Sequence, residues 1–162
     1  MIKLSLRVNG KAITDTVQPD EMLIDFLRRH GFKSVKRGCD TSNCGLCTVI
    51  IDGKASLSCS TLAARCEGKD IETLEGLEEE AKYIRPYLAG EGADQCGFCN
   101  PGYIVCTVAL GREEENPDDE KIISYLKGNL CRCTGYMSQA RALRAYFDDR
   151  ASGRLNAEVG HE

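Results

Sequence analysis

A chain of 162 residues is long enough to bury one or two small cores without disulfides, although it carries ten cysteines. Its formal net charge is -4 and its basic residues are scattered, so it lacks the dense basic run that nucleic-acid binding requires. No apolar run approaches the roughly 18 residues of a membrane span and the first residues read as a strand rather than a leader, so we expect a cytoplasmic protein with no membrane insertion.

The first half of the sequence predicts a small sheet with one helix. Residues 2–8 and 11–17 alternate apolar and polar residues on either side of an Asn-Gly pair, which is the commonest two-residue hairpin turn. Asp20 is the candidate cap of a helix that ends at the His-Gly pair of 30–31. A short apolar strand follows over 48–51.

The second half predicts helices from about residue 78 onward. The spacing of apolar residues predicts helices over 78–88 and 101–111, the second with Asn100 as its cap and a proline at its first position. A third helix is expected to begin at Asp118 or Asp119, and a fourth follows the last pair of cysteines.

Segment 65–76 is the predicted joint between the two halves, because the sheet pattern ends before it and the helical pattern begins after it. We therefore predict an α+β protein of two domains. The boundaries place the first domain over residues 1–76 and the second over residues 77–162.

The first of two groups of four cysteines has the spacing C-x4-C-x2-C-x11-C and consists of Cys39, Cys44, Cys47 and Cys59. Its opening part has the plant-type ferredoxin spacing, in which thiolates hold a [2Fe-2S] cluster. Gly38 and Gly45 suit such a loop because glycine takes positive φ and lets backbone N–H groups point at anionic sulfur. The alternative is a four-cysteine zinc site, but zinc usually binds two separated pairs, so the spacing favours the cluster.

The second group of four cysteines joins a C-x2-C pair to a C-x-C pair and consists of Cys96, Cys99, Cys131 and Cys133. Their number and type fit either a second cluster or structural zinc, and the spacing alone leaves both open. The two remaining cysteines are expected to be buried as small apolar side chains; they are Cys66 and Cys106.

Three segments together are specific enough to indicate a protein family: GCDTSNCGLCTVIIDG at 38–53, QCGFCNPG at 95–102 and GNLCRCTGY at 128–136. On these segments the chain resembles the small iron-sulfur subunit of the molybdenum hydroxylases, the family of xanthine dehydrogenase, aldehyde oxidoreductase, nicotinate dehydrogenase and carbon monoxide dehydrogenase. The resemblance implies an N-terminal ferredoxin-like β-grasp domain and a C-terminal four-helix bundle domain. Each is expected to hold one [2Fe-2S] cluster, so zinc in the second group becomes disfavoured.

The resemblance further implies partner chains that carry the active site. A large partner subunit is expected to bind molybdopterin with molybdenum and a medium one to bind FAD, in a heterotrimer that can dimerise. Electrons would then pass from the molybdopterin centre through both clusters to the flavin. By resemblance, Gln95 hydrogen-bonds the pterin, and the Cys133 sulfur faces the pterin amino group while it binds iron. No catalytic residue is expected on this chain.

Some positions depart from the family pattern without removing a ligand. Leu46 is expected to shield the first cluster from water, and Asn100 keeps a capping ability. Gln139 stands where an aliphatic residue is common, which makes the docking of a partner less certain. Arg37 and Arg132 lie beside ligands and either offset cluster charge or are simply solvated.

Two other classes of function are open on the sequence. A free-standing two-cluster ferredoxin would carry electrons between unrelated enzymes, although the helical second domain argues against it. A zinc-stabilised interaction module would contain zinc without iron or acid-labile sulfide. The leading hypothesis is an electron-transfer subunit of an oxidoreductase.

Overall fold

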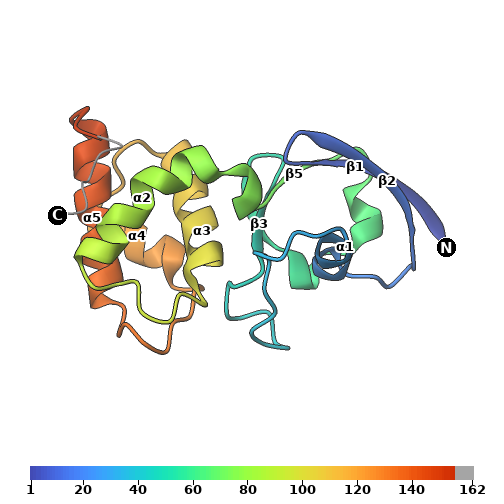
Figure 1. Cartoon of the computed structure of the whole chain (residues 1–162), viewed down its shortest axis with the longest axis horizontal. Coiled ribbons are helices and arrows are strands. Elements are labelled where there is room, and N and C mark those ends of the chain that lie inside the picture. The colour runs from blue at the N-terminus through green and yellow to red at the C-terminus, as the bar shows by residue number, and fades with distance from the viewer. Residues whose placement is uncertain (156–162) are drawn as a thin grey trace.

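The computed structural model describes residues 1–155, in which a sheet with a short helix forms one half and four helices form the other (Figure 1). The strands are β1 (Ile2–Val8), β2 (Lys11–Val17), β3 (Thr48–Ile51), β4 (Lys54–Leu57) and β5 (Asp70–Glu72). The helices are α1 (Leu23–Arg29), α2 (Glu78–Gly90), α3 (Asn100–Glu113), α4 (Asp119–Leu126) and α5 (Met137–Ala151). None of these helices is long and apolar enough to cross a bilayer.

The strands of residues 1–155 form one sheet of mixed direction. The strand order is β2-β1-β5-β3-β4. The predicted first hairpin is confirmed, because β1 and β2 pair antiparallel from Ile2 opposite Val17 to Val8 opposite Lys11. β5 pairs parallel with β1 and antiparallel with β3, and it therefore lies in the middle of the sheet.

The prediction of a joint over 65–76 is wrong for its central part, because residues 70–72 form β5. A strand of three residues is too short to show the alternation that predicts a strand. Ile71 is its one fully buried residue, at 0% exposure. Pairing with strands far away in the sequence, rather than a local pattern, makes this segment a strand.

The helix α1 begins later than predicted, and Asp20 is not its cap. Met22, which precedes the helix, is extended and forms an isolated antiparallel bridge with Leu62. The N–H of Leu23 donates to the carbonyl oxygen of Thr61 at 2.7 Å. The helix therefore begins directly after the residues that pair with segment 61–62. The local sequence does not reveal this start, because the pairing partner is distant in the chain.

The helices predicted in the second half are confirmed, with shifted ends. Cys99 caps α3 and Asn100 is already helical, so the cap predicted at Asn100 is wrong. The side-chain N–H of Asn100 donates instead to Asp94 at 2.8 Å. Asp118, one of the two predicted caps of α4, accepts the N–H of Lys121 at 2.8 Å.

Two apolar cores, one in each half, meet at β3. Val49 packs in the core of the sheet half, whereas the next residue, Ile50, packs in the core among the helices. Successive side chains of a strand point to opposite faces, so β3 has one face in each core. The two halves therefore share buried surface and are not joined by a linker alone.

An ion-pair bridge also ties α3 to the sheet. Arg112 donates to Glu72 of β5 at 2.6 and 3.1 Å and to Glu80 of α2 at 2.7 Å. Lysine has no planar fork to hold both carboxylates, so we expect Arg112→Lys to lower the free energy of unfolding by about 0.5–1 kcal/mol, as measured by urea unfolding. The control is Arg85→Lys, because Arg85 pairs with Glu78 of its own helix. Equal losses in the two variants would contradict a bridging role for Arg112.

Candidate metal centres

The first four predicted ligands come from two places in the sheet half. Cys39, Cys44 and Cys47 lie in the loop between α1 and β3, and Cys59 lies in the turn after β4. Ser58 holds that turn against the loop, because its N–H and its hydroxyl donate to the carbonyl oxygen of Cys47 at 3.3 and 2.7 Å. The fold therefore brings Cys59 to the loop that carries the other three thiols.

The four thiols of this first site meet as two pairs, Cys39 with Cys44 and Cys47 with Cys59. The pKa of Cys39 is lowered to about 6, mainly by the backbone N–H of Asn43, whose nitrogen lies 3.4 Å from the sulfur. Burial, and next the thiol of Cys59, raises the pKa of Cys47 to about 11. Two close, buried thiols resist carrying two negative charges unless a cation joins them, which is the role of iron in a thiolate site.

Glycines shape this loop in two different ways. Gly45 takes a φ of +70°, as predicted, and a Cβ there would lie 2.6 Å from the carbonyl oxygen of Gly128 in the helical half. The prediction of positive φ is wrong for Gly38, which provides space instead: a Cβ there would lie 2.7 Å from Cδ2 of Leu46. Ser42, with a φ of 57°, makes a left-handed turn that the sequence did not predict.

The second four predicted ligands come from the loops that precede α3 and α5. Cys96 and Cys99 lie before α3, and Cys131 and Cys133 lie before α5. Their thiols also meet as two pairs, Cys99 with Cys131 and Cys96 with Cys133. Burial, and next the contact with Cys131, raises the pKa of Cys99 to about 12. The Cys99 pair lies deeper, whereas Cys96 and Cys133 are both exposed.

Two side chains of the second loop orient Cys131. The hydroxyl of Thr134 donates to the Cys131 sulfur at 3.2 Å, and the N–H of Cys131 donates to the Tyr136 hydroxyl at 3.2 Å. Burial acts to raise the pKa of Cys131, but the hydrogen bonds from Thr134 outweigh it and the pKa is lowered. Sequence reasoning missed these supporting roles because no spacing or motif signals which side chains of a loop will reach Cys131.

The pairing of the thiols decides what they can bind. Among residues 1–155, no group of three or more His, Cys, Asp or Glu side chains is arranged around the position of a single metal ion. A [2Fe-2S] cluster needs two thiolates at each of its two irons, because bridging sulfides complete both tetrahedra. Each site supplies two pairs of thiols, so its donor set fits a two-iron cluster.

The two sites are neighbours across the boundary between the halves. The N–H of Leu130 donates to the carbonyl oxygen of Cys44 at 2.9 Å, and the side-chain N–H of Asn129 donates to that of Gly45 at 3.3 Å. A cavity of about 390 Å³ is lined by thiols of both sites and by Leu46. Leu46 is 7% exposed and lines this cavity next to thiols of both sites.

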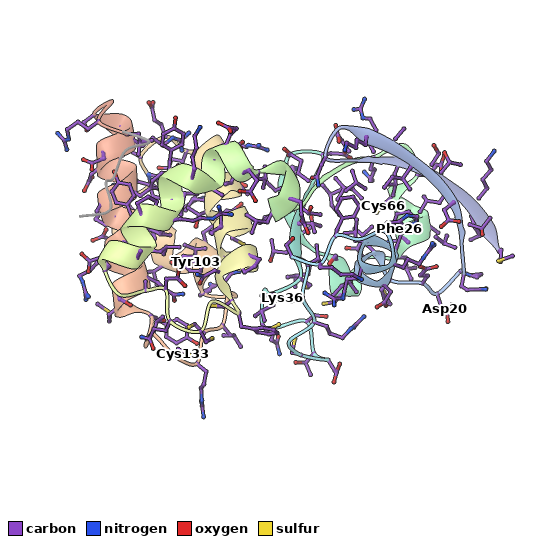
Figure 2. The ribbon with its side chains drawn as sticks, viewed as in Figure 1. Asp20, Phe26, Lys36, Cys66, Tyr103 and Cys133 are labelled. Atoms are coloured by element: carbon purple, nitrogen blue, oxygen red, sulfur yellow. The ribbon has the colours of Figure 1, made fainter. Side chains whose placement is uncertain are left out.

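The outer edge of the second site is open to solvent. Gln95, Cys96 and Cys133 are exposed, and Figure 2 shows Cys133 at the lower edge of the helical half. Phe98 and Tyr136 line the same cavity as Cys133 and are 51% and 47% exposed. This edge therefore presents a ligand sulfur next to apolar surface.

Of the two arginines beside predicted ligands, Arg37 is held in place. It donates to both carboxylate oxygens of Asp25 at 2.9 Å. That hydrogen bond is the main cause of its raised pKa, and the negative charges of Cys59 and Asp40 add to it. Arg132 is exposed in the loop between Cys131 and Cys133.

The two cysteines outside the sites are buried, as predicted. Cys66 is 1% exposed and Cys106 is 7% exposed. Burial raises the pKa of both thiols. Cys66 belongs to the same apolar core as Phe26, in the sheet half, where Figure 2 labels both residues.

The side chain of Gln139 is buried beside the second site. It is 2% exposed and faces inward. Its Nε2 lies 3.9 Å from the sulfur of Cys99. The only sequence signal for this contact is a polar residue at a helix position where an aliphatic one is common.

Comparison with known proteins supports the division into two cysteine sites. Residues 6–72 match the family described as "2Fe-2S iron-sulfur cluster binding domain", and residues 73–144 match the family described as "[2Fe-2S] binding domain". Together these matches cover most of the chain. Each contains one of the two groups of four cysteines.

Two curated relatives are similar over nearly their whole length. The nicotinate dehydrogenase small FeS subunit of Eubacterium barkeri is 40% identical over 146 residues, covering 88% of this chain and 93% of the relative. The xanthine dehydrogenase iron-sulfur-binding subunit of Escherichia coli O157:H7 is 45% identical over 139 residues, covering 83% and 87%. The aldehyde oxidoreductase of Desulfovibrio gigas has a similar structure, with a TM-score of 0.90 and 32% identity over 100% of this chain and 18% of that one.

Proposed function

The chain belongs to the family of small iron-sulfur subunits of the molybdenum hydroxylases, and on that premise we propose which thiols share an iron. In the first site, Cys39 and Cys44 bind one iron and Cys47 and Cys59 bind the other. In the second site, the two pairs are Cys99 with Cys131 and Cys96 with Cys133. The single observation that carries this assignment is the pairing of the eight thiols.

The chain is an electron-transfer component of an oxidoreductase. The eight thiols would hold two [2Fe-2S] clusters, which would supply one-electron transfer between the proposed molybdopterin centre of one partner and the proposed flavin of another. The protein's own part is to hold the thiols in pairs, to keep water away with Leu46, and to fix the two loops at short range. The hydrogen bond between Leu130 and Cys44 serves the last purpose, because it joins the loops directly.

We further propose a domain layout. Residues 1–76 form a ferredoxin-like β-grasp domain, and residues 77–162 form the second domain, a four-helix bundle made by α2, α3, α4 and α5. The support is the sheet in the first half, the helices in the second and the family matches that meet at residues 72 and 73. Residues 156–162 lie outside the described part of the chain.

The proposed partners are a large molybdopterin-binding subunit and a medium FAD-binding subunit in a heterotrimer. The exposed edge at Gln95 and Cys133 is the proposed contact with the large subunit, with Gln95 as hydrogen-bond partner of the pterin. Its support is the joint exposure of an amide, a ligand sulfur and apolar side chains. The aldehyde oxidoreductase match, over 18% of that chain, fits a module that works inside a larger enzyme.

Native mass spectrometry of the protein, tagged and purified anaerobically from its own cells, tests this function. We expect a complex with a large and a medium partner, and iron with acid-labile sulfide on the 17.8 kDa chain. A lone chain with both clusters would favour a free-standing ferredoxin. Zinc without iron or sulfide would refute the cluster assignment.

A further inference from the structure

A buried amide stands next to a proposed iron ligand. Gln139 of α5 is 2% exposed, and its Nε2 lies 3.9 Å from the sulfur of Cys99. Its Oε1 is buried without a hydrogen-bond partner among residues 1–155. Tyr103, Ile122 and Leu126 line the mainly apolar cavity that Gln139 also lines. Within the described chain, the contact of Nε2 with the Cys99 sulfur is therefore the recognisable polar interaction of this amide.

The orientation of the amide follows from the chemistry of the sulfur. A thiolate bound to iron only accepts hydrogen bonds, so the NH₂ end of Gln139 must face Cys99 and the carbonyl end must face away. The carbonyl end is then buried without a hydrogen-bond partner among residues 1–155. A buried acceptor without a partner destabilises the fold, whereas an aliphatic side chain would fit the same place without that cost.

We propose that Gln139 is a positioning residue that raises the reduction potential of the second cluster by donating an N–H hydrogen bond to the Cys99 sulfur. This inference rests on the proposed function, since it requires iron at the second site. Reduction adds one electron and no proton to the site, and the extra negative charge spreads over the ligand sulfurs. A donor N–H aimed at one of them stabilises the reduced form.

Gln139 acts together with a second donor on the same pair of thiols. The hydroxyl of Thr134 donates to Cys131 at 3.2 Å, and Cys131 is the proposed partner of Cys99 on one iron. The other pair, Cys96 with Cys133, is exposed. The protein therefore supplies both side-chain donors to the deeper pair.

The test is an anaerobic redox titration of the full chain with both clusters, followed by EPR, for the wild type and Gln139→Leu. We expect Gln139→Leu to lower the midpoint potential of the second cluster by about 59 mV. For a one-electron couple, this shift changes the distribution of the electron between the two clusters about tenfold in favour of the first cluster. The midpoint of the first cluster is expected not to move. Gln139→Met, which has similar length and no donor, is a second variant with the same expected shift.

Ser138→Ala is the matched control. Ser138 is the preceding residue of α5, and its hydroxyl is likewise buried without a partner among residues 1–155. Because the hydroxyl of Ser138 makes no hydrogen bond to a ligand sulfur within residues 1–155, we expect the midpoint potentials of both clusters to stay unchanged. An unmoved second midpoint in Gln139→Leu and Gln139→Met, with both EPR signals present, would overturn the inference. The absence of a second iron-sulfur signal in the wild type would instead overturn the proposed function.

Discussion

Replacing Cys44 with serine is expected to remove or alter the EPR signal of the first cluster, to halve the iron bound per chain if that cluster is lost, and to preserve the signal of the second. Serine binds iron through an oxygen, which as alkoxide is harder and more basic than a thiolate, so one iron of the first site loses a soft donor. The side chain of Cys44 is 6% exposed, and serine fits the same space because it has the same shape and is slightly smaller. The carbonyl oxygen of residue 44 still accepts the N–H of Leu130, and the contact between the halves remains.

The matched control for this change is Cys66→Ser. Cys66 is also a buried thiol of the sheet half, 1% exposed, and it lies outside the proposed sites. We expect this variant to keep both EPR signals and its full iron content, at some loss of stability. Loss of both signals in a Cys44→Ser chain with native circular dichroism would refute the idea that the two sites assemble separately.

Replacing Gly102 with alanine is expected to lower the free energy of unfolding by about 1–3 kcal/mol, because overpacking at a tight contact forces the backbone to move. Gly102 lies in the first turn of α3, where the helix meets the first cysteine loop. A Cβ there would overlap the carbonyl oxygen of Gly45 and lie 3.0 Å from the Cα of Leu46. Both are backbone atoms between Cys44 and Cys47, so the loop has to shift to make room.

Gly90→Ala is the control that separates this clash from helix propensity. Gly90 ends α2, and within the described chain a Cβ on it would meet nothing within 4 Å. Alanine is favoured over glycine inside a helix by up to about 1 kcal/mol, so this variant should keep or raise stability. Urea unfolding of the cluster-loaded chains gives the comparison. A Gly102→Ala midpoint at or above the wild-type value would show that the close approach of α3 and the loop is not tight.

Features that depend on interactions between residues close in the sequence were predicted correctly, whereas features that depend on distant residues were not. The first hairpin and the helices α2 to α5 were predictable because each depends on a turn, a cap or a period within a few neighbouring residues. The strand β5 was missed, since its three residues depend on pairing with β1 and β3. The start of α1 was misplaced for the same reason, because Met22 pairs with the distant Leu62.

The sequence by itself determined three clusters of close thiols, because Cys39, Cys44 and Cys47 share one short loop and the C-x2-C and C-x-C pairs each keep two thiols together, whereas the fold brings Cys59 to the first loop and joins the two pairs. Only the tertiary structure decided which thiols pair, how closely the two sites lie, and that Gln139 faces Cys99. These features arise where α3 and α5 meet the loops of other elements. Local spacing cannot encode a contact between residues 40 positions apart, such as that of Gln139 with Cys99. Packing of the helices against one another and against β3 decides it.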